Sequence, residues 1–151
     1  VTLGNAKVGA GETNAALKST RAASRLARDA MKKSPDDAGP KELFTGTALL
    51  EGEVLSALGR HREAAAMADK GIAANRELLT IFGDVASAPM NLATRLHEAS
   101  TIYEAAGRKS KSCAMMTEAV KIIKNHQKKA ELPPATVKNT LDPMLAKLKS
   151  C

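Results

Sequence analysis

The sequence predicts an all-α protein, an α-solenoid in which antiparallel helical hairpins stack into a superhelix of about six helices. The first observation is composition: alanine is abundant, and the 151 residues include two Phe, one Tyr and no Trp. Alanine is the strongest helix former and lets helices approach closely, whereas sheets favour β-branched and aromatic residues. The second is spacing, because Gly11, Gly59 and Gly107 lie 48 residues apart and each opens an alanine-rich stretch. Such an equal interval predicts a repeated structural unit.

Small side chains recur at the same distances after each of these glycines. Three columns of equivalent positions lie four and then three residues apart, so they share one face of a helix. The columns are Ala16, Ala64 and Ser112, then Thr20, Ala68 and Met116, then Ala23, Gly71 and Ala119. Gly59 and Gly107 each follow a helical pattern, and glycine adopts the left-handed turn that closes a helix. Each unit is therefore expected to be a hairpin of two antiparallel helices.

Turn-forming residues divide the chain into successive helices. Residues 34–37 (Ser-Pro-Asp-Asp) stop the first helix, and proline favours helix starts at Pro40 and near Pro89. Residues 1–11 are glycine-rich and are expected to form a flexible segment. The expected helices cover residues 12–33, 40–58, 60–82, 89–106, 109–129 and 133–151. Because the first hairpin lacks its first helix, we expect the chain to be part of a larger array.

Residues 133–151 are expected to form a capping helix. A terminal repeat needs a polar outer face, and here one apolar stripe lies opposite several lysines. The stripe consists of Val137, Leu141, Met144, Leu145 and Leu148. Pro143 lies inside this helix and should bend or split it, because proline cannot donate a backbone hydrogen bond.

Two hairpins carry a motif that resembles the tetratricopeptide repeat. That family has a small residue in the first helix, glycine at the turn, and two core residues four apart in the second helix. The matching residues are Gly52, Gly59, Ala64 and Ala68 in one copy, and Ser100, Gly107, Ser112 and Met116 in the next. Ala48 stands where the family often has tryptophan, and the period is 48 residues rather than about 34. The resemblance implies a tetratricopeptide-like superhelix, with a half repeat at 12–33 and repeats at 41–83 and 90–130.

The formal charge of +7 is concentrated at the two ends of the chain. Residues 1–35 and residues 121–151 each carry seven basic and two acidic side chains, a balance of +5. Residues 36–120 carry nine basic and twelve acidic side chains, a balance of −3. Proteins that bind nucleic acid more often gather basic groups on one surface, and single-strand binders add aromatic platforms. The basic ends are therefore interpreted as solvated lysine-rich faces.

Cysteine usage and hydropathy predict a cytoplasmic protein. Cys113 and Cys151 form neither a CxxC pair nor a cysteine-dense framework, so both are interpreted as free thiols in a reducing compartment. No apolar run approaches the roughly 20 residues that span a bilayer. No basic-then-apolar leader begins the chain.

No constellation of residues predicts catalysis, so the chain is not expected to be an enzyme or to hold a cofactor or metal. His61, His97 and His126 fall in different expected helices, and none has a partner at a metal-ligand spacing. The glycines of residues 9–11 lack the Gly-Lys-Ser/Thr ending of a phosphate loop.

The resemblance implies that the first helices of successive hairpins line a concave groove. On this wall the family geometry places Leu49, Glu53 and Ser56 from one hairpin, and Thr94, His97, Thr101 and Glu104 from the next. The wall is small, polar and acidic, which favours a basic or mixed peptide as ligand. We expect Glu53 and Glu104 to pair with Lys or Arg of that partner. The alternative, that these carboxylates simply face water, stays open.

Together these features predict a non-catalytic protein–protein interaction module, a scaffold or docking segment. The long-period, alanine-rich copies are similar to repeat segments that accompany bacterial signalling proteins, which implies a place in a larger regulatory protein. The alternative from another functional class is a basic helical module that binds nucleic acid or another polyanion. Salt dependence separates the two, because a polyanion binder loses affinity log-linearly as salt rises.

Overall fold

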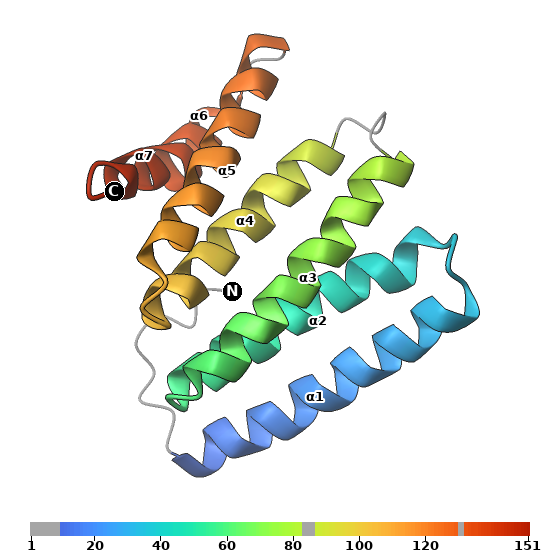
Figure 1. The fold of residues 1–151 in the computed structure, drawn as a ribbon. Coiled ribbons are helices and arrows are strands. Elements are labelled where there is room, and N and C mark those ends of the chain that lie inside the picture. Colours follow the sequence, from blue (N-terminus) through green and yellow to red (C-terminus); the bar gives the residue numbers. More distant parts are fainter. Residues whose placement is uncertain (1–9, 83–86, 130–131) are drawn as a thin grey trace.

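The computed structural model describes residues 10–82, 87–129 and 132–151, and within these ranges all regular secondary structure is helical. The long helices are α1 (Ala10–Lys33), α2 (Ala38–Ala57), α3 (His61–Phe82), α4 (Ala88–Ala105) and α5 (Lys109–Lys129) (Figure 1). An irregular sixth helix combines α6 (Pro134–Thr136), a π-helical turn η1 (Val137–Leu141) and α7 (Asp142–Leu148). For these residues the all-α prediction is confirmed. The flexible segment expected at 1–11 lies outside the described ranges, except for its last two residues, which begin α1.

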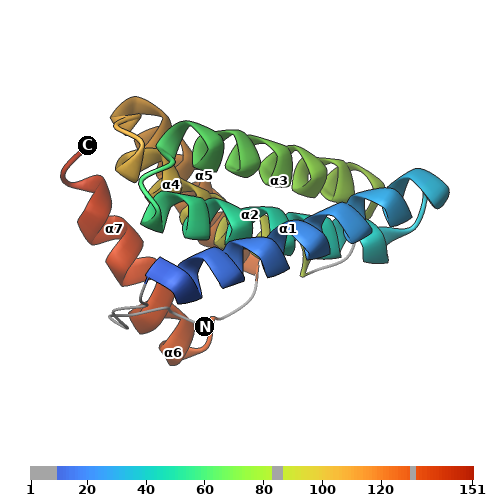
Figure 2. The ribbon, with the colours of Figure 1, turned by 90° about the horizontal axis from the view of Figure 1, so that it is seen from below.

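The helices pack in the order in which they follow one another along the chain. Each of α1 to α4 contacts the next helix, α2 also contacts α4, and α7 packs against α5. Figure 1 shows α1 at one end of the molecule and α7 at the other, and Figure 2 shows α7 crossing the direction of the long helices. One hydrophobic core includes residues from α1 to α5 and from the C-terminal helix. Within the described ranges, no helix is long and apolar enough to cross a membrane.

Two of the three equally spaced glycines form the expected turns. Gly59 and Gly107 have backbone φ angles of +73° and +72°, a conformation that side chains with a Cβ rarely adopt. After α2, the amide of Arg60 donates to the carbonyl of Leu55 at 2.9 Å, the long-range bond of a Schellman motif, and the turn after α4 repeats this pattern. Gly11 instead lies inside the first turn of α1. It therefore marks a repeat position without forming a turn.

The expected seam of small residues lies where α2 and α3 approach each other. A Cβ added to Gly52 would lie 2.9 Å from Cδ1 of Ile102 and 3.2 Å from the carbonyl oxygen of Ala64. A Cβ added to Gly71 would lie 3.3 Å from the carbonyl oxygen of Thr45. All three distances are shorter than ordinary carbon contacts, so these glycines set how closely the helices pack.

Alternate helices are joined by ion pairs at repeat-equivalent positions. Arg21 of α1 pairs with Glu63 of α3 at 3.3 Å, and Asp69 of α3 pairs with Lys111 of α5 at 2.6 Å. Arg21 and Asp69 each lie ten residues after a periodic glycine, while Glu63 and Lys111 each lie four residues after one. In both ion pairs, a residue ten positions after a periodic glycine contacts a residue four positions after one. The first of these is basic in one pair and acidic in the other.

Pro143 divides the C-terminal helix as expected. The α-helical pattern gives way to the π-helical turn η1 just before it, and the amide of Asp142 donates to the carbonyl of Val137. Proline lacks the amide hydrogen that would continue the α-helical pattern, so neighbouring groups shift to a wider turn. Met144 and Leu141 nevertheless stay buried in the core. The C-terminal helix therefore contributes to the core, and its role as a cap stays a prediction.

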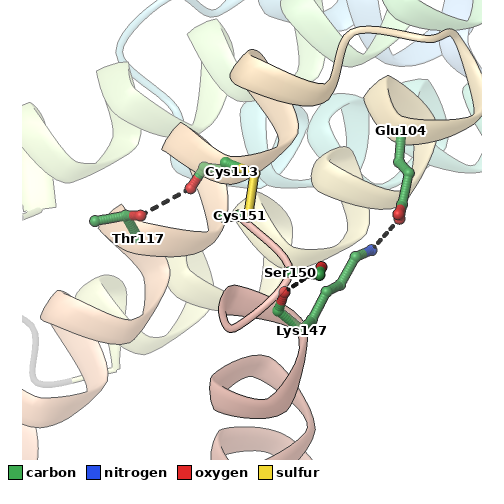
Figure 3. Close-up of a disulfide and its surroundings, with 6 residues drawn as sticks. All are labelled: Glu104, Cys113, Thr117, Lys147, Ser150 and Cys151. Atoms are coloured by element: carbon green, nitrogen blue, oxygen red, sulfur yellow. Dashed lines mark hydrogen bonds and ion pairs between the residues drawn. A yellow bond between two sulfur atoms is a disulfide. The ribbon is translucent and has the colours of Figure 1, made fainter.

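The prediction of free thiols is wrong, because Cys113 and Cys151 form a disulfide (Figure 3). Cys113 lies in the first turns of α5 and Cys151 follows α7, with a sequence separation of 38. The two sulfurs meet because the C-terminal helix packs against α5 and brings Cys151 to the first turns of that helix. With no free thiol left, the argument from cysteine usage for a reducing compartment loses its basis.

Candidate partner-binding surface

One residue of the groove predicted on α2 is buried, and its neighbour in the sequence is exposed instead. Leu49 is only 1% exposed and belongs to the core, so its predicted place on the groove wall is wrong. Leu43 and Leu50 are instead 57% and 42% exposed, although both are large apolar residues. Glu53 and Ser56 are half-buried.

On α4 the predicted residues separate into two groups. Thr94 and Thr101 are exposed, and the hydroxyl of Thr94 donates to the carbonyl of Met90 within its own helix. His97 is half-buried, and burial, followed by the positive charge of Lys147, lowers the pKa of its imidazole. This favours a neutral ring at physiological pH.

Glu104 already has a partner within the chain. Its carboxylate pairs with Nζ of Lys147 from α7 at 2.6 Å, close to the disulfide (Figure 3). The C-terminal helix thus supplies the basic side chain that we expected from a partner protein. The unoccupied part of the surface therefore lies on α2 and on the half of α4 nearest to it.

Arg95 connects α4 to α2 across this surface. Its Nη1 donates to Glu98 at 2.9 Å, and its Nη2 lies 3.6 Å from the position that a Cβ on Gly46 would take. The guanidinium therefore lies over the backbone of α2 at Gly46, where the missing side chain leaves a shallow depression. This contact was not predicted, because nothing in the sequence indicates which residue of α4 faces Gly46.

Two depressions meet at Arg95. A shallow one of about 410 Å³ runs along α2 and is lined by Gly39, Glu42, Leu43, Gly46, Thr47, Leu50 and Arg95. A second, of about 250 Å³, lies between the ends of α2, α3 and α4, where Leu78, Leu79 and Phe82 make it largely apolar. Glu42 and Arg95 line both depressions, so they form one continuous surface.

Glu53 is a half-buried carboxylate on this surface. Burial raises its pKa, the nearby charge of Glu98 raises it further, and Arg95 partly opposes both effects. Among the described residues, Glu53 forms no hydrogen bond or ion pair. Glu42, Glu53 and Glu98 outnumber Arg95, so the surface favours a positively charged ligand.

Replacing Glu53 with glutamine is expected to raise the melting temperature at pH 7 but not at pH 3.5. A carboxyl group whose pKa is raised by folding lowers stability once it ionises, as the pH rises through that pKa. Below the pKa of the unfolded chain, about 4.3 for glutamate, both states are neutral and the cost is absent. Thermal unfolding at both pH values measures the difference.

Glu42→Gln is the matched control, because its carboxylate is on the same helix but exposed to solvent. Burial as the cause of the raised Glu53 pKa would be contradicted if both substitutions raised the melting temperature equally. It would also be contradicted if Glu53→Gln changed the melting temperature equally at the two pH values.

The described residues contain no group of three His, Cys, Asp or Glu side chains that could hold a metal ion. His61, His97 and His126 lie in α3, α4 and α5 respectively. Among the hydrogen bonds of the described residues, no predicted polar side chain places a base beside a nucleophile.

Leu43, Leu50 and Arg95 are the surface residues that sequence reasoning missed. A helical projection of α2 gives apolar side chains on more than one face, since Leu49 and Leu50 are adjacent. The pattern alone does not indicate which of the two points to the core. In comparisons with known proteins, no family model matches the chain, and no curated protein or solved structure is similar to it.

Proposed function

We propose that this chain is a non-catalytic docking module that binds a protein partner on the surface formed by α2 and α4. The observation that carries the proposal is the pair of exposed leucines, Leu43 and Leu50, beside the half-buried carboxylate of Glu53. Exposed apolar side chains next to a partly desolvated charge favour a ligand that covers the first and neutralises the second. The expected partner segment therefore carries apolar and basic side chains.

We further propose that the hairpins form a tetratricopeptide-like solenoid. The glycine turns after α2 and α4 have the same hydrogen bonds, which supports two equivalent hairpins. The ion pairs Arg21–Glu63 and Asp69–Lys111 use equivalent positions, which supports a similar step from α1 to α3 and from α3 to α5. In such an array the first helices, here α2 and α4, line the concave side. The docking surface lies on these two helices.

A second candidate function is binding of a nucleic acid or another polyanion through α1. Five basic side chains of this helix have no acidic partner among the described ion pairs: Lys18, Arg25, Arg28, Lys32 and Lys33. Arg21, by contrast, is engaged by Glu51 and Glu63. Binding by the α1 face would weaken steeply with salt. Binding by the α2–α4 surface relies on apolar contacts and should depend on salt only weakly.

Photo-crosslinking from defined positions tests the docking function. A crosslinking side chain at Leu50 is expected to capture a protein from native extract, whereas the same group at the exposed Ala73 of α3 should not. After identification and purification of the captured protein, Glu53→Lys should weaken its binding about tenfold, because two like charges would meet in a partly desolvated site. Titration calorimetry measures the change in Kd.

The outcomes separate the two functions. Equal capture from Leu50 and Ala73, together with an unchanged Kd for Glu53→Lys, would contradict docking on α2 and α4. A steep log-linear loss of affinity with salt, relieved by replacing Arg25 and Arg28 with glutamine, would instead support the polyanion function.

A further inference from the structure

Four neighbouring residues of α2 form an open socket on the docking surface. Leu43, Gly46, Thr47 and Leu50 stand at positions i, i+3, i+4 and i+7 of the helix, and all four line the depression of about 410 Å³. When two helices pack, each inserted side chain enters a hole bounded by four residues with this spacing on the facing helix. The exposed face of α2 is therefore shaped to receive one side chain from another helix.

The chemistry of the socket favours an aliphatic side chain. Gly46 forms its low side, because it has no Cβ, and Nη2 of Arg95 lies 3.6 Å from the position that a Cβ would take. The hydroxyl of Thr47 already donates to the carbonyl of Leu43 at 2.9 Å, so its methyl group is left for contact. The two leucines bound the socket on either side. The hydroxyl hydrogen of Thr47 and Nη1 of Arg95 are thus already engaged within the chain.

The backbone of α2 disfavours an extended ligand. Its amide and carbonyl groups are hydrogen-bonded inside the helix and offer no free edge to a strand. An extended peptide laid over the leucines would bury its own backbone groups without partners, at a cost for each. A helical ligand satisfies those groups internally and presents only side chains.

Charge indicates what flanks the inserted side chain. Glu53 lies toward the C-terminal end of α2, roughly 10 Å or two helical turns from the centre of the socket. A basic residue two turns from the inserted side chain would reach this carboxylate. A second copy of α2 would bring its own Glu42 and Glu53 against the same groups, so like charges oppose a symmetric pair of these chains.

We propose that the ligand is an amphipathic α-helix of a partner protein, which inserts an aliphatic side chain between Leu43, Gly46 and Leu50 and places a Lys or Arg against Glu53. This inference rests on the docking function proposed above and names its ligand. It commits to a helix packed side by side with α2, in contrast to a peptide bound in extended form.

Selection from a displayed library of random peptides of about 16 residues, roughly four helical turns, tests the proposal. Peptides are selected on the native chain and depleted on the Gly46→Leu variant, whose new side chain fills the socket. Leucine is tolerated there, because the first added atom would meet only the flexible Arg95 side chain at an ordinary contact distance. Circular dichroism and the melting temperature verify that this variant is folded.

Recovered peptides are expected to carry aliphatic residues three and four positions apart and at least one Lys or Arg. Their affinity for Gly46→Leu should fall at least tenfold, the equivalent of about 1.4 kcal/mol. Gly11→Leu, the same substitution at an exposed position of α1, should change the Kd less than twofold. Proline in the middle of a recovered peptide should also weaken binding at least tenfold, because it breaks the helix.

The proposal is overturned if the selected peptides are proline-rich or acidic, if central proline leaves their affinity unchanged, or if no sequence is enriched on the native chain over Gly46→Leu. Failure here is distinct from failure of the docking function. Extended peptides that compete with capture from Leu50 would leave docking intact and refute only the helical ligand. Absence of both capture and selected peptides would refute both.

Discussion

Replacing Cys113 with serine is expected to lower the free energy of unfolding by about 3–4 kcal/mol. Its disulfide to Cys151 closes a loop with a sequence separation of 38, which includes most of α5 and the whole C-terminal helix. A cross-link of this span restricts the unfolded chain, so its loss makes unfolding more favourable. Urea denaturation followed by circular dichroism, without reductant, measures the difference.

Three comparisons isolate the covalent bond. Cys151→Ser and the double variant should lose as much stability as Cys113→Ser, because each removes the same bond. A dithiol reductant should reproduce the loss in the native chain. Lys147→Ala removes only the neighbouring exposed ion pair with Glu104 and should cost less than about 1 kcal/mol. Two alkylatable thiols in the unreduced protein, with unchanged stability of Cys113→Ser, would contradict the disulfide.

Gly52→Val is expected to destabilise the protein by about 1–3 kcal/mol, the usual cost of overpacking a close contact. The first added carbon would lie 2.9 Å from Cδ1 of Ile102 and 3.2 Å from the backbone oxygen of Ala64. The Ile102 side chain can move, but the oxygen belongs to the backbone of α3 and moves only if the helix does. Thermal and urea unfolding of the variant measure the loss.

Gly46→Val is the matched control for this prediction, since it makes the same change six residues earlier on the same helix. At Gly46 the added carbon would meet only the guanidinium of Arg95 at 3.6 Å. Valine is also a somewhat better helix former than glycine, so stability should change by less than about 0.5 kcal/mol. Equal losses for the two variants would show that the helix disfavours valine generally and that the seam is not the cause.

The hairpins could be predicted because their signals are local. A glycine that must adopt a positive φ angle, after an amphipathic stretch, ends a helix whatever lies elsewhere in the fold, as at Gly59 and Gly107. Proline acts just as locally, and Pro143 splits the last helix as expected. Asp37 also fixes a helix start, since its carboxylate accepts the amide of Gly39 at 2.9 Å. That bond places the start of α2 slightly before the expected Pro40.

Contacts between distant elements could not be predicted. The disulfide and the Lys147–Glu104 pair both depend on the direction in which the C-terminal helix folds back, which no local pattern specifies. The predicted groove wall wrongly included Leu49 for a related reason. Leu49 and Leu50 are equally apolar, and only the positions of α3 and α4 determine which of them is covered. Glu53 is half-buried, and its role in binding a partner stays a prediction.

The exchanged charges of the two ion pairs between alternate helices affect which helices can associate. Arg21 meets Glu63, whereas Asp69 meets Lys111 at the equivalent positions. If α1 of one molecule displaced α3 of another from its place beside α5, Arg21 would face Lys111, and two basic groups would repel each other. An α3 that took the place of α1 would likewise set Asp69 against Glu63. Exposed pairs of this kind add little stability, but like charges at these positions would make an exchanged arrangement less favourable than the native one.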